Sequence, residues 1–148
     1  MIVYEKEYSL PTAKILLVDD NPSDTNVLSM AISGLDEDVD IEIVTDGQKA
    51  LEFVHLRRRN RAEEHPCVIV LDLHLPRHDG LEVLKAIREE PVLSHIHVVI
   101  LTGAATHSEV AELNRMGAHY RTKPMNLSGY DELAADLLAL CKGLELAA

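Results

Sequence analysis

The chain has 148 residues, enough for one domain with a single core and too few for two. Hydrophobic residues make up 47% and charged residues 26%, as in an ordinary globular domain, and the net charge of −11 disfavours nucleic-acid binding through a general basic surface. No apolar run reaches the roughly 20 residues of a membrane helix. The first nine residues carry three charged side chains where a signal peptide would be apolar, so we expect a cytoplasmic protein.

Short runs of apolar and β-branched residues predict five strands. In chain order they cover residues 14–18, 41–44, 68–71, 97–101 and, more weakly, 118–122. The first, third and fourth runs are almost continuously apolar, which is typical of strands buried on both faces of a sheet. The second run is shorter and more polar, so we expect it at an edge.

The segments after the strands have the spacing of amphipathic helices. Pro22, Ser23 and Asp24 suit the first turn of a helix. The apolar stripes are Val27, Leu28, Ala31, Ile32 and Leu35; then Leu81, Leu84 and Ile87; then Val110, Leu113 and Gly117; and finally Tyr130, Leu133, Ala134, Leu137, Leu138 and Cys141. Strand–helix units in strict alternation predict a parallel sheet with helices on both faces.

The basic run in the second helix and the two cysteines both have simple structural interpretations. The basic run at residues 57–61 ends the second helix before Pro66, where cations complement a helix C-terminus, so it does not indicate nucleic-acid binding. Cys67 and Cys141 are too few for a disulfide framework or a zinc site. Because Cys67 begins an apolar run and Cys141 closes a helical stripe, we expect both to be small core residues.

Polar residues follow four of the predicted strands. Asp19 and Asp20 follow the first, Asp72 the third, Thr102 the fourth and Lys123 the fifth. In an open parallel sheet, ligands bind outside the carboxyl ends of the strands. We therefore expect three carboxylates, one hydroxyl and one ammonium group at the same edge.

This set of groups suits phosphoryl transfer to the protein. Carboxylates and a carbonyl are hard-oxygen ligands for Mg²⁺, and one carboxylate can act as the nucleophile. A lysine and a hydroxyl can then stabilise the oxygens of the phosphoryl group. Taken singly, each residue has a simpler explanation: Asp19 and Asp20 could cap the next helix, and Asp72 could only end a strand.

The same residues carry a resemblance to a known family. The segment at residues 72–80 (DLHLPRHDG), together with Asp19-Asp20, Thr102-Gly103 and Lys123-Pro124, resembles the bacterial response-regulator receiver domain. The resemblance implies a flavodoxin-like (βα)₅ fold with strand order 2-1-3-4-5. It implies a receiver domain over residues 14–141, with an N-terminal arm at 1–13 and a C-terminal tail at 142–148.

The resemblance also implies the roles of the acidic residues. Asp72 would accept a phosphoryl group from a sensor histidine kinase. Asp20, Asp72 and the backbone carbonyl of His74 would bind Mg²⁺, with Asp19 acting through a water molecule. The backbone N–H groups of His74 and Gly103 would contact the phosphoryl group.

Further roles follow from the same resemblance. Thr102 and Lys123 would contact the phosphoryl group, Tyr120 would act with Thr102 as a switch, and the Lys123–Pro124 peptide bond would be cis. His74 and Ala104 depart from the residues most common at their positions, which in the family tune the hydrolysis of the acyl phosphate. A metal-binding role for the His74 imidazole, or for His95 with His97, stays open beside the simpler interpretation of surface histidines.

The expected partners follow the family as well. A single-domain regulator would bind a sensor histidine kinase, and the basic end of the second helix resembles regulators of phytochrome-type kinases. A downstream target or phosphotransfer protein would be the second partner. A homodimer could form through the fourth helix, fifth strand and fifth helix. We expect no nucleic-acid or membrane partner.

Three other functions fit parts of the pattern. A haloacid-dehalogenase-like phosphatase also uses Asp, Thr and Lys at strand ends with Mg²⁺, but it requires an Asp-x-Asp motif where this chain has Asp19-Asp20-Asn21. A degenerate receiver that only binds proteins would lack acceptor residues that are all present here. A flavin-binding relative of flavodoxin is disfavoured by the lack of Trp and the single Phe. We therefore expect a signalling domain that catalyses only its own phosphorylation and dephosphorylation, not an enzyme with turnover.

Overall fold

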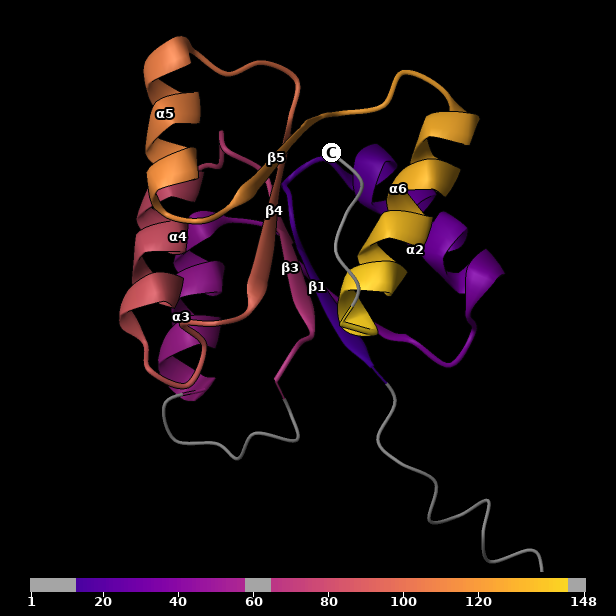
Figure 1. Cartoon of the computed structure of the whole chain (residues 1–148), viewed down its shortest axis with the longest axis horizontal. Coiled ribbons are helices and arrows are strands. Elements are labelled where there is room, and N and C mark those ends of the chain that lie inside the picture. The colour runs from indigo at the N-terminus through magenta and orange to yellow at the C-terminus, as the bar shows by residue number, and fades with distance from the viewer. Residues whose placement is uncertain (1–12, 58–64, 144–148) are drawn as a thin grey trace, which may run out of the picture.

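A computed structural model describes residues 13–57 and 65–143 of the chain. Ten elements alternate between strand and helix (Figure 1). They are β1 (Lys14–Val18), α2 (Pro22–Leu35), β2 (Asp40–Val44), α3 (Gly47–Arg57), β3 (Val68–Leu71), α4 (Gly80–Glu89), β4 (His97–Thr102), α5 (His107–Arg115), β5 (His119–Thr122) and α6 (Leu127–Cys141).

The sheet has five parallel strands in the order β2-β1-β3-β4-β5. This confirms the flavodoxin-like fold and the position of the second strand at an edge. All four residues of β3 are buried, whereas β2 has only Val44 buried, as their apolar patterns predict. Three predicted strand boundaries move by one residue: Asp40 begins β2, Thr102 ends β4 and His119 begins β5.

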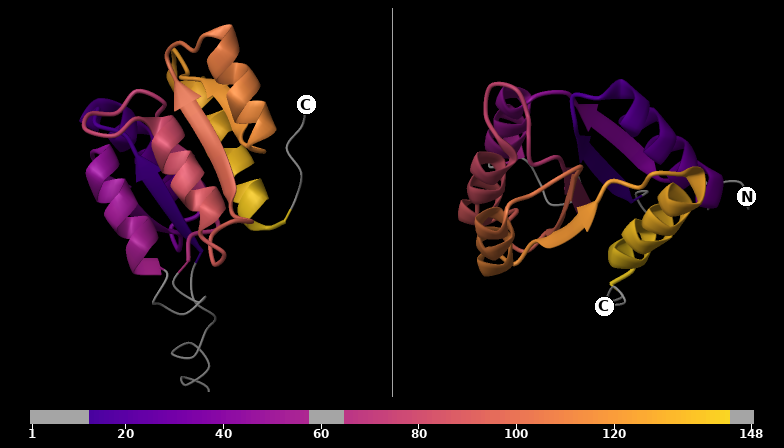
Figure 2. Two further views of the ribbon diagram at one scale, coloured as in Figure 1. Left: turned by 90° about the vertical axis from the view of Figure 1, so that its left-hand side faces the viewer. Right: turned by 90° about the horizontal axis from the view of Figure 1, so that it is seen from above.

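Helices cover both faces of the sheet. Figures 1 and 2 show α3, α4 and α5 on one face and α2 and α6 on the other. Alternate residues of β1 point to opposite faces: Leu16 and Val18 pack on the α3–α5 side, and Ile15 and Leu17 on the α2–α6 side. Leu35, which the stripe placed on the buried face of the first helix, is 55% exposed because it is the last residue of α2.

The helices begin at defined caps that bring their first turns to the carboxyl edge of the sheet. The side chain of Asn21 accepts hydrogen bonds from the backbone N–H groups of Ser23 and Asp24 at 3.0 and 3.2 Å. Asn21, and neither Asp19 nor Asp20, is thus the cap of α2. Both carboxylates remain free of that structural role.

The expectation for the cysteines is wrong in one respect. Cys67 and Cys141 do pack against the core on the α2–α6 side, but they form a disulfide with a Cα–Cα distance of 5.0 Å. The pairing arises because the fold brings the residue before β3 beside the last residue of α6. Since 74 positions separate the two cysteines along the chain, their spacing alone did not reveal it.

Three predicted segments lie wholly or partly outside the described residues. These are most of the N-terminal arm, the end of the C-terminal tail and, beyond Arg57, the basic run. In the part of the chain that the structure describes, no helix is long and apolar enough to cross a membrane.

Candidate functional site

The acidic residues converge at the carboxyl ends of β1 and β3. Because β1 and β3 pair directly, Asp19 and Asp72 follow neighbouring strand ends, and the amide of Asp72 donates to the carbonyl of Val18 at 2.9 Å. Asp19 and Asp72 are buried, with 8% and 7% exposure, while Asp20 is exposed. Ligand oxygens of the three residues lie within 4.8 Å of one another, so the predicted convergence is confirmed.

Burial makes the Asp19 carboxylate costly to ionise. Desolvation is the main cause that raises the pKa of Asp19, and the charge of Asp72 adds to it. A hydrogen bond from the Asn21 amide, at 3.0 Å, and the ammonium of Lys123 act in the opposite direction without cancelling the rise. A cation bound beside Asp19 would therefore favour its ionised form.

Lys123 supplies one cation at the centre of the cluster. Its Nζ lies 3.0 Å from Oδ2 of Asp19 and 3.2 Å from Oδ2 of Asp72, which confirms that the ammonium group and these carboxylates lie at the same edge. The backbone N–H of Lys123 donates to the carbonyl of Thr102 at 2.9 Å and fixes where the side chain starts. Burial lowers the pKa of Lys123, but hydrogen bonds to Asp24 and Asp19 and the charge of Asp72 outweigh this and raise it above its usual value.

Asp24 is a member of the cluster that the sequence analysis missed. Its Oδ2 lies 2.8 Å from the Nζ of Lys123, the shortest of the three carboxylate contacts. The hydroxyl of the buried Tyr130 donates to its other oxygen at 3.4 Å. The available signal was its position in the first turn of the helix that begins at the site, four residues after Asp20.

Thr102 and His74 meet at one carbonyl group. The hydroxyl of Thr102, which is 1% exposed, donates to the backbone oxygen of Ala104 at 3.3 Å. The Nε2 of His74 lies 3.1 Å from the same oxygen, and the backbone N–H of His74 donates to Oδ1 of Asp72 at 3.2 Å. These contacts join the loop after β3 to the loop after β4.

The histidine alternatives for a metal site gain no support. Among the residues that the structure describes, Asp19, Asp20 and Asp72 form the only group of three or more potential ligands close enough to share an ion. The His74 imidazole bonds to a carbonyl instead, and the ring of His97 packs against that of His119, with centroids 5.8 Å apart.

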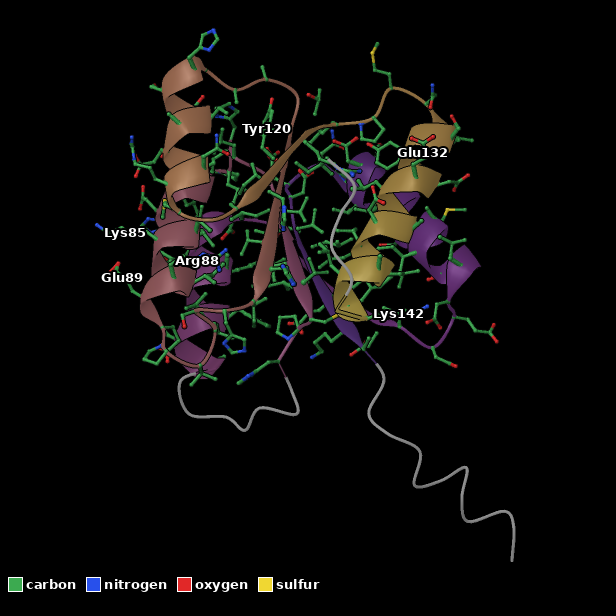
Figure 3. All side chains as sticks on the ribbon, in the orientation of Figure 1. Lys85, Arg88, Glu89, Tyr120, Glu132 and Lys142 are labelled. Carbon is green, nitrogen blue, oxygen red and sulfur yellow. A yellow bond between two sulfur atoms is a disulfide. The ribbon has the colours of Figure 1, made fainter. Side chains whose placement is uncertain are left out.

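Tyr120 lies on β5, and its predicted role as a switch stays a prediction, whereas the predicted cis proline is wrong. Tyr120 pairs in register with Ile100, two residues before Thr102, and packs against the core on the α3–α5 side of the sheet (Figure 3). No cis peptide bond occurs among the described residues, so the expected cis Lys123–Pro124 bond is wrong. Trans is the intrinsic preference of such bonds, and Lys123 reaches the cluster from that geometry.

The chain matches the family described as the response regulator receiver domain over residues 15–133. It belongs to that family. The receiver domain is therefore a module of two-component signalling, and the phosphatase alternative receives no support from the match.

Two curated relatives illustrate its similarities. Response regulator Rcp1 of Synechocystis sp. is 32% identical over 138 residues, which cover 93% of this chain and 89% of Rcp1. Transcriptional regulatory protein TrcR of Mycobacterium tuberculosis is 35% identical over 130 residues, and that match covers 87% of this chain and 45% of TrcR.

Solved structures show the same fold. The receiver domain matches a Mn²⁺-bound form of Rcp1 with a TM-score of 0.75 and 29% identity, over 92% of this chain and 99% of Rcp1. It matches the phosphorylated cyanobacterial phytochrome response regulator RcpA with a TM-score of 0.76 and 28% identity, over 93% of this chain and 99% of RcpA. The bacteriophytochrome response regulator RtBRR matches with a TM-score of 0.69 and 32% identity, over 93% of this chain and 81% of RtBRR.

Proposed function

We propose that this receiver domain, spanning residues 14–141, accepts a phosphoryl group on Asp72 from a sensor histidine kinase in the cytoplasm. The observation that carries the proposal is the position of the Asp72 carboxylate. It lies in a group of three converging carboxylates, with the ammonium of Lys123 3.2 Å from one of its oxygens. A nucleophile, a cation and sites for a metal ion thus meet at one edge of the sheet.

The donor set fits Mg²⁺. Carboxylate and carbonyl oxygens are the ligands this ion prefers, and the exposed Asp20 leaves the cluster accessible from solvent. Asp19, Asp20, Asp72 and the backbone carbonyl of His74 would hold the ion. Bound there, Mg²⁺ would offset negative charge on the transferred phosphoryl group. Crystals of the related Rcp1 contain Mn²⁺.

The residues of the chain perform the remaining steps. An oxygen of Asp72 attacks phosphorus, the phosphorus–nitrogen bond of a phosphohistidine breaks, and its electron pair stays on the imidazole. Lys123 then pairs with a phosphoryl oxygen, and Thr102 turns its hydroxyl from the Ala104 carbonyl to another. The backbone N–H groups of His74 and Gly103 would bind the remaining charge. The domain acts on itself and has no separate substrate to turn over.

The first prediction tests the acceptor. Asp72→Asn keeps the shape of the side chain but removes the nucleophilic charge, so incorporation of phosphate from acetyl phosphate with Mg²⁺ should fall below detection. Intact mass spectrometry measures the added phosphate. Asp38→Asn, at an exposed position between α2 and β2, is the matched control and should be modified like the unchanged chain. Full modification of the Asp72 variant, or phosphate at another residue, would contradict the proposal.

We propose that phosphorylation changes the surface formed by α5, β5 and α6. Withdrawal of the Thr102 hydroxyl toward phosphate would leave space for the ring of Tyr120 on the neighbouring strand. A nearly complete shift between two states needs about 5.5 kcal/mol of differential binding. Charge-assisted hydrogen bonds to Lys123 and Thr102, at about 1.5–3 kcal/mol each, are of the required size.

This switch would control partner binding. A downstream protein, a phosphotransfer protein or a second copy of the chain would dock on the α5–β5–α6 surface. The similarity to RcpA and RtBRR supports a phytochrome-type kinase as the phosphate donor. We do not extend the proposal to DNA, since the net charge of −11 opposes it.

The second prediction tests the coupling. Thr102→Ala should still accept phosphate or beryllofluoride, an anion that mimics the phosphoryl group, but Tyr120 should respond less. The NMR signals of the Tyr120 ring and sedimentation of the chain, each with and without beryllofluoride, measure the two responses. An undiminished change in both would reject the coupling and leave the phosphorylation chemistry untouched.

A further inference from the structure

Lys123 is already paired with three carboxylates before any phosphoryl group arrives. An ammonium group has three N–H donors, and its Nζ lies near Asp24, Asp19 and Asp72 at 2.8, 3.0 and 3.2 Å. The side chain of Lys123 is only 18% exposed, so water screens these contacts less than it would at the surface. Any new acceptor for Lys123 must therefore compete with the carboxylates that already pair with it.

Asp24 differs from the other two acceptors in where it sits. Asp19 directly follows β1 and Asp72 directly follows β3. Both belong to the acidic group that could hold a metal ion. Asp24 lies on α2, outside that group, and no role in metal binding follows from its position. Its shortest contact in the site is with Lys123.

The Asp24 carboxylate is also fixed in place from more than one direction. Its own backbone N–H donates to the cap residue Asn21 at 3.2 Å, which sets the first turn of α2. The hydroxyl of Tyr130, from α6, donates to Oδ1 at 3.4 Å, while Oδ2 accepts from Lys123. Tyr130 is 7% exposed, so its ring is anchored in the core.

We propose that Asp24 is a positioning residue that holds Lys123 back from the phosphoryl site and thereby weakens the binding of a phosphoryl group at Asp72. The inference rests on the proposed function of Asp72. In the unmodified chain, Lys123 is divided among three carboxylates. After phosphorylation, one of its N–H groups must turn to a phosphoryl oxygen, and the bond to Asp24 opposes that change.

The proposal predicts that one substitution strengthens the binding of beryllofluoride and weakens the binding of Mg²⁺. Asp24→Asn removes the negative charge but keeps an oxygen that can accept from Tyr130. Lys123 is then freer to pair with an anion at Asp72, so beryllofluoride, in saturating Mg²⁺, should bind about tenfold more tightly. Mg²⁺ alone should bind more weakly, because the freed ammonium interacts more strongly with Asp19 and Asp72. A folding defect would instead weaken both.

The experiment measures both dissociation constants on the full chain. Fluorine NMR follows beryllofluoride, calorimetry follows Mg²⁺, and a thermal melt confirms that each variant is folded. Asp38→Asn makes the same change of charge between α2 and β2, beyond the far end of the helix, and should leave both constants unchanged. Unchanged or weaker binding of beryllofluoride by the Asp24 variant would overturn the proposal.

A second comparison separates Lys123 from a general effect of charge. Asp24→Asn is combined with Lys123→Met, and the change in beryllofluoride affinity is compared between the two backgrounds. The gain should largely vanish when Lys123 is absent, because Asp24 acts through it. An equal gain in both backgrounds would show direct repulsion of the anion by Asp24 and would reject the positioning role.

The same data distinguish this inference from the proposed function. If the unchanged chain and Asp72→Asn bind beryllofluoride equally, Asp72 is not the acceptor site and the proposed function fails, and this inference fails with it. If only Asp72→Asn loses binding and Asp24→Asn has no effect, the proposed function stands and the role of Asp24 is wrong.

Discussion

His119 begins β5 with several positive or potentially positive groups around it. Burial is the main cause that lowers its pKa below the usual 6.5, and His97, Arg121 and Arg88 lower it further. The ring of His97 lies 5.8 Å away, between centroids. The fold therefore favours the neutral form of His119. The stability that depends on this neutral form is present above pH 6.5 and is lost as the pH falls toward the pKa in the folded chain.

His119→Gln should make the chain less sensitive to acid. Between about pH 7.5 and pH 5.5, which brackets the usual histidine pKa, the unchanged chain should lose more thermal stability than the variant. Thermal melts at the two pH values measure the difference. His95→Gln, at an exposed position before β4, is the control and should follow the unchanged chain. Equal losses in all three proteins would contradict the assigned role of His119.

Among single residues, the sequence predicted those at or just after strand ends better than those on helices. Asp19, Asp72, Thr102 and Lys123 could be placed together because parallel strands end at one edge, whatever the details of packing. Asp24 could not, since its contact with Lys123 depends on the rotation of α2 about its axis. That rotation is set by side-chain packing against the sheet and α6, which the apolar stripe indicates only coarsely.

Arg88 of α4 joins three parts of the chain that lie apart in sequence. Its Nε and Nη2 donate to the carbonyls of Met116 and Gly117, at the end of α5, at 2.8 and 3.2 Å. Its Nη1 donates to the carbonyls of Ser94 and Ile96, before β4, at 3.2 and 2.8 Å. One guanidinium thus satisfies carbonyl groups that neither a helix nor the sheet would pair.

Arg88→Met should destabilise the chain by about 2–3 kcal/mol, because it keeps the apolar stem but leaves those carbonyls without the charged donor. Urea unfolding measures the change. Lys85→Met removes the same charge from the same helix at an exposed position, where Figure 3 shows the side chain projecting away from the sheet. The control should change stability by less than about 0.5 kcal/mol. Similar losses in both variants would attribute the effect to net charge instead.

Helices and strands were predictable where the pattern of apolar residues fits only one kind of element. The buried strands β1, β3 and β4 were found to within one residue, because runs of apolar residues leave no other arrangement in a parallel sheet. The role of Arg88 was not found, because its hydrogen bonds go to backbone carbonyls and backbone geometry is absent from side-chain patterns.

Across the whole molecule, the Cys67–Cys141 disulfide links the strand that leads to Asp72 with the end of α6. A cross-link over 74 positions restricts the unfolded chain and should stabilise the fold by about 4 kcal/mol. Urea unfolding with and without a reducing agent measures this contribution. A variant with Cys67→Ser and Cys141→Ser should be insensitive to the reducing agent. An equal response of both proteins would show that the disulfide does not contribute.

The disulfide also bears on the proposed location. Disulfides persist in oxidising compartments and are rare in the cytosol, where such pairs are usually transient or sense the redox state. Trapping thiols in intact cells before lysis would measure the oxidised fraction directly. A cytoplasmic chain should carry a substantial fraction of reduced Cys67 and Cys141, and complete oxidation would place the protein elsewhere.

When oxidised, the bond makes part of the chain a closed covalent ring. β3, α4, β4, α5, β5 and α6 lie within it, and with them Asp72, Thr102 and Lys123, whereas Asp19 and Asp24 lie on the segment outside. A single protease cut anywhere inside the ring would leave two fragments joined by the disulfide, which run as one band on a non-reducing gel and as two bands on a reducing one. A cut ahead of Cys67 would separate the fragments on both gels, and with them the two halves of the acidic site.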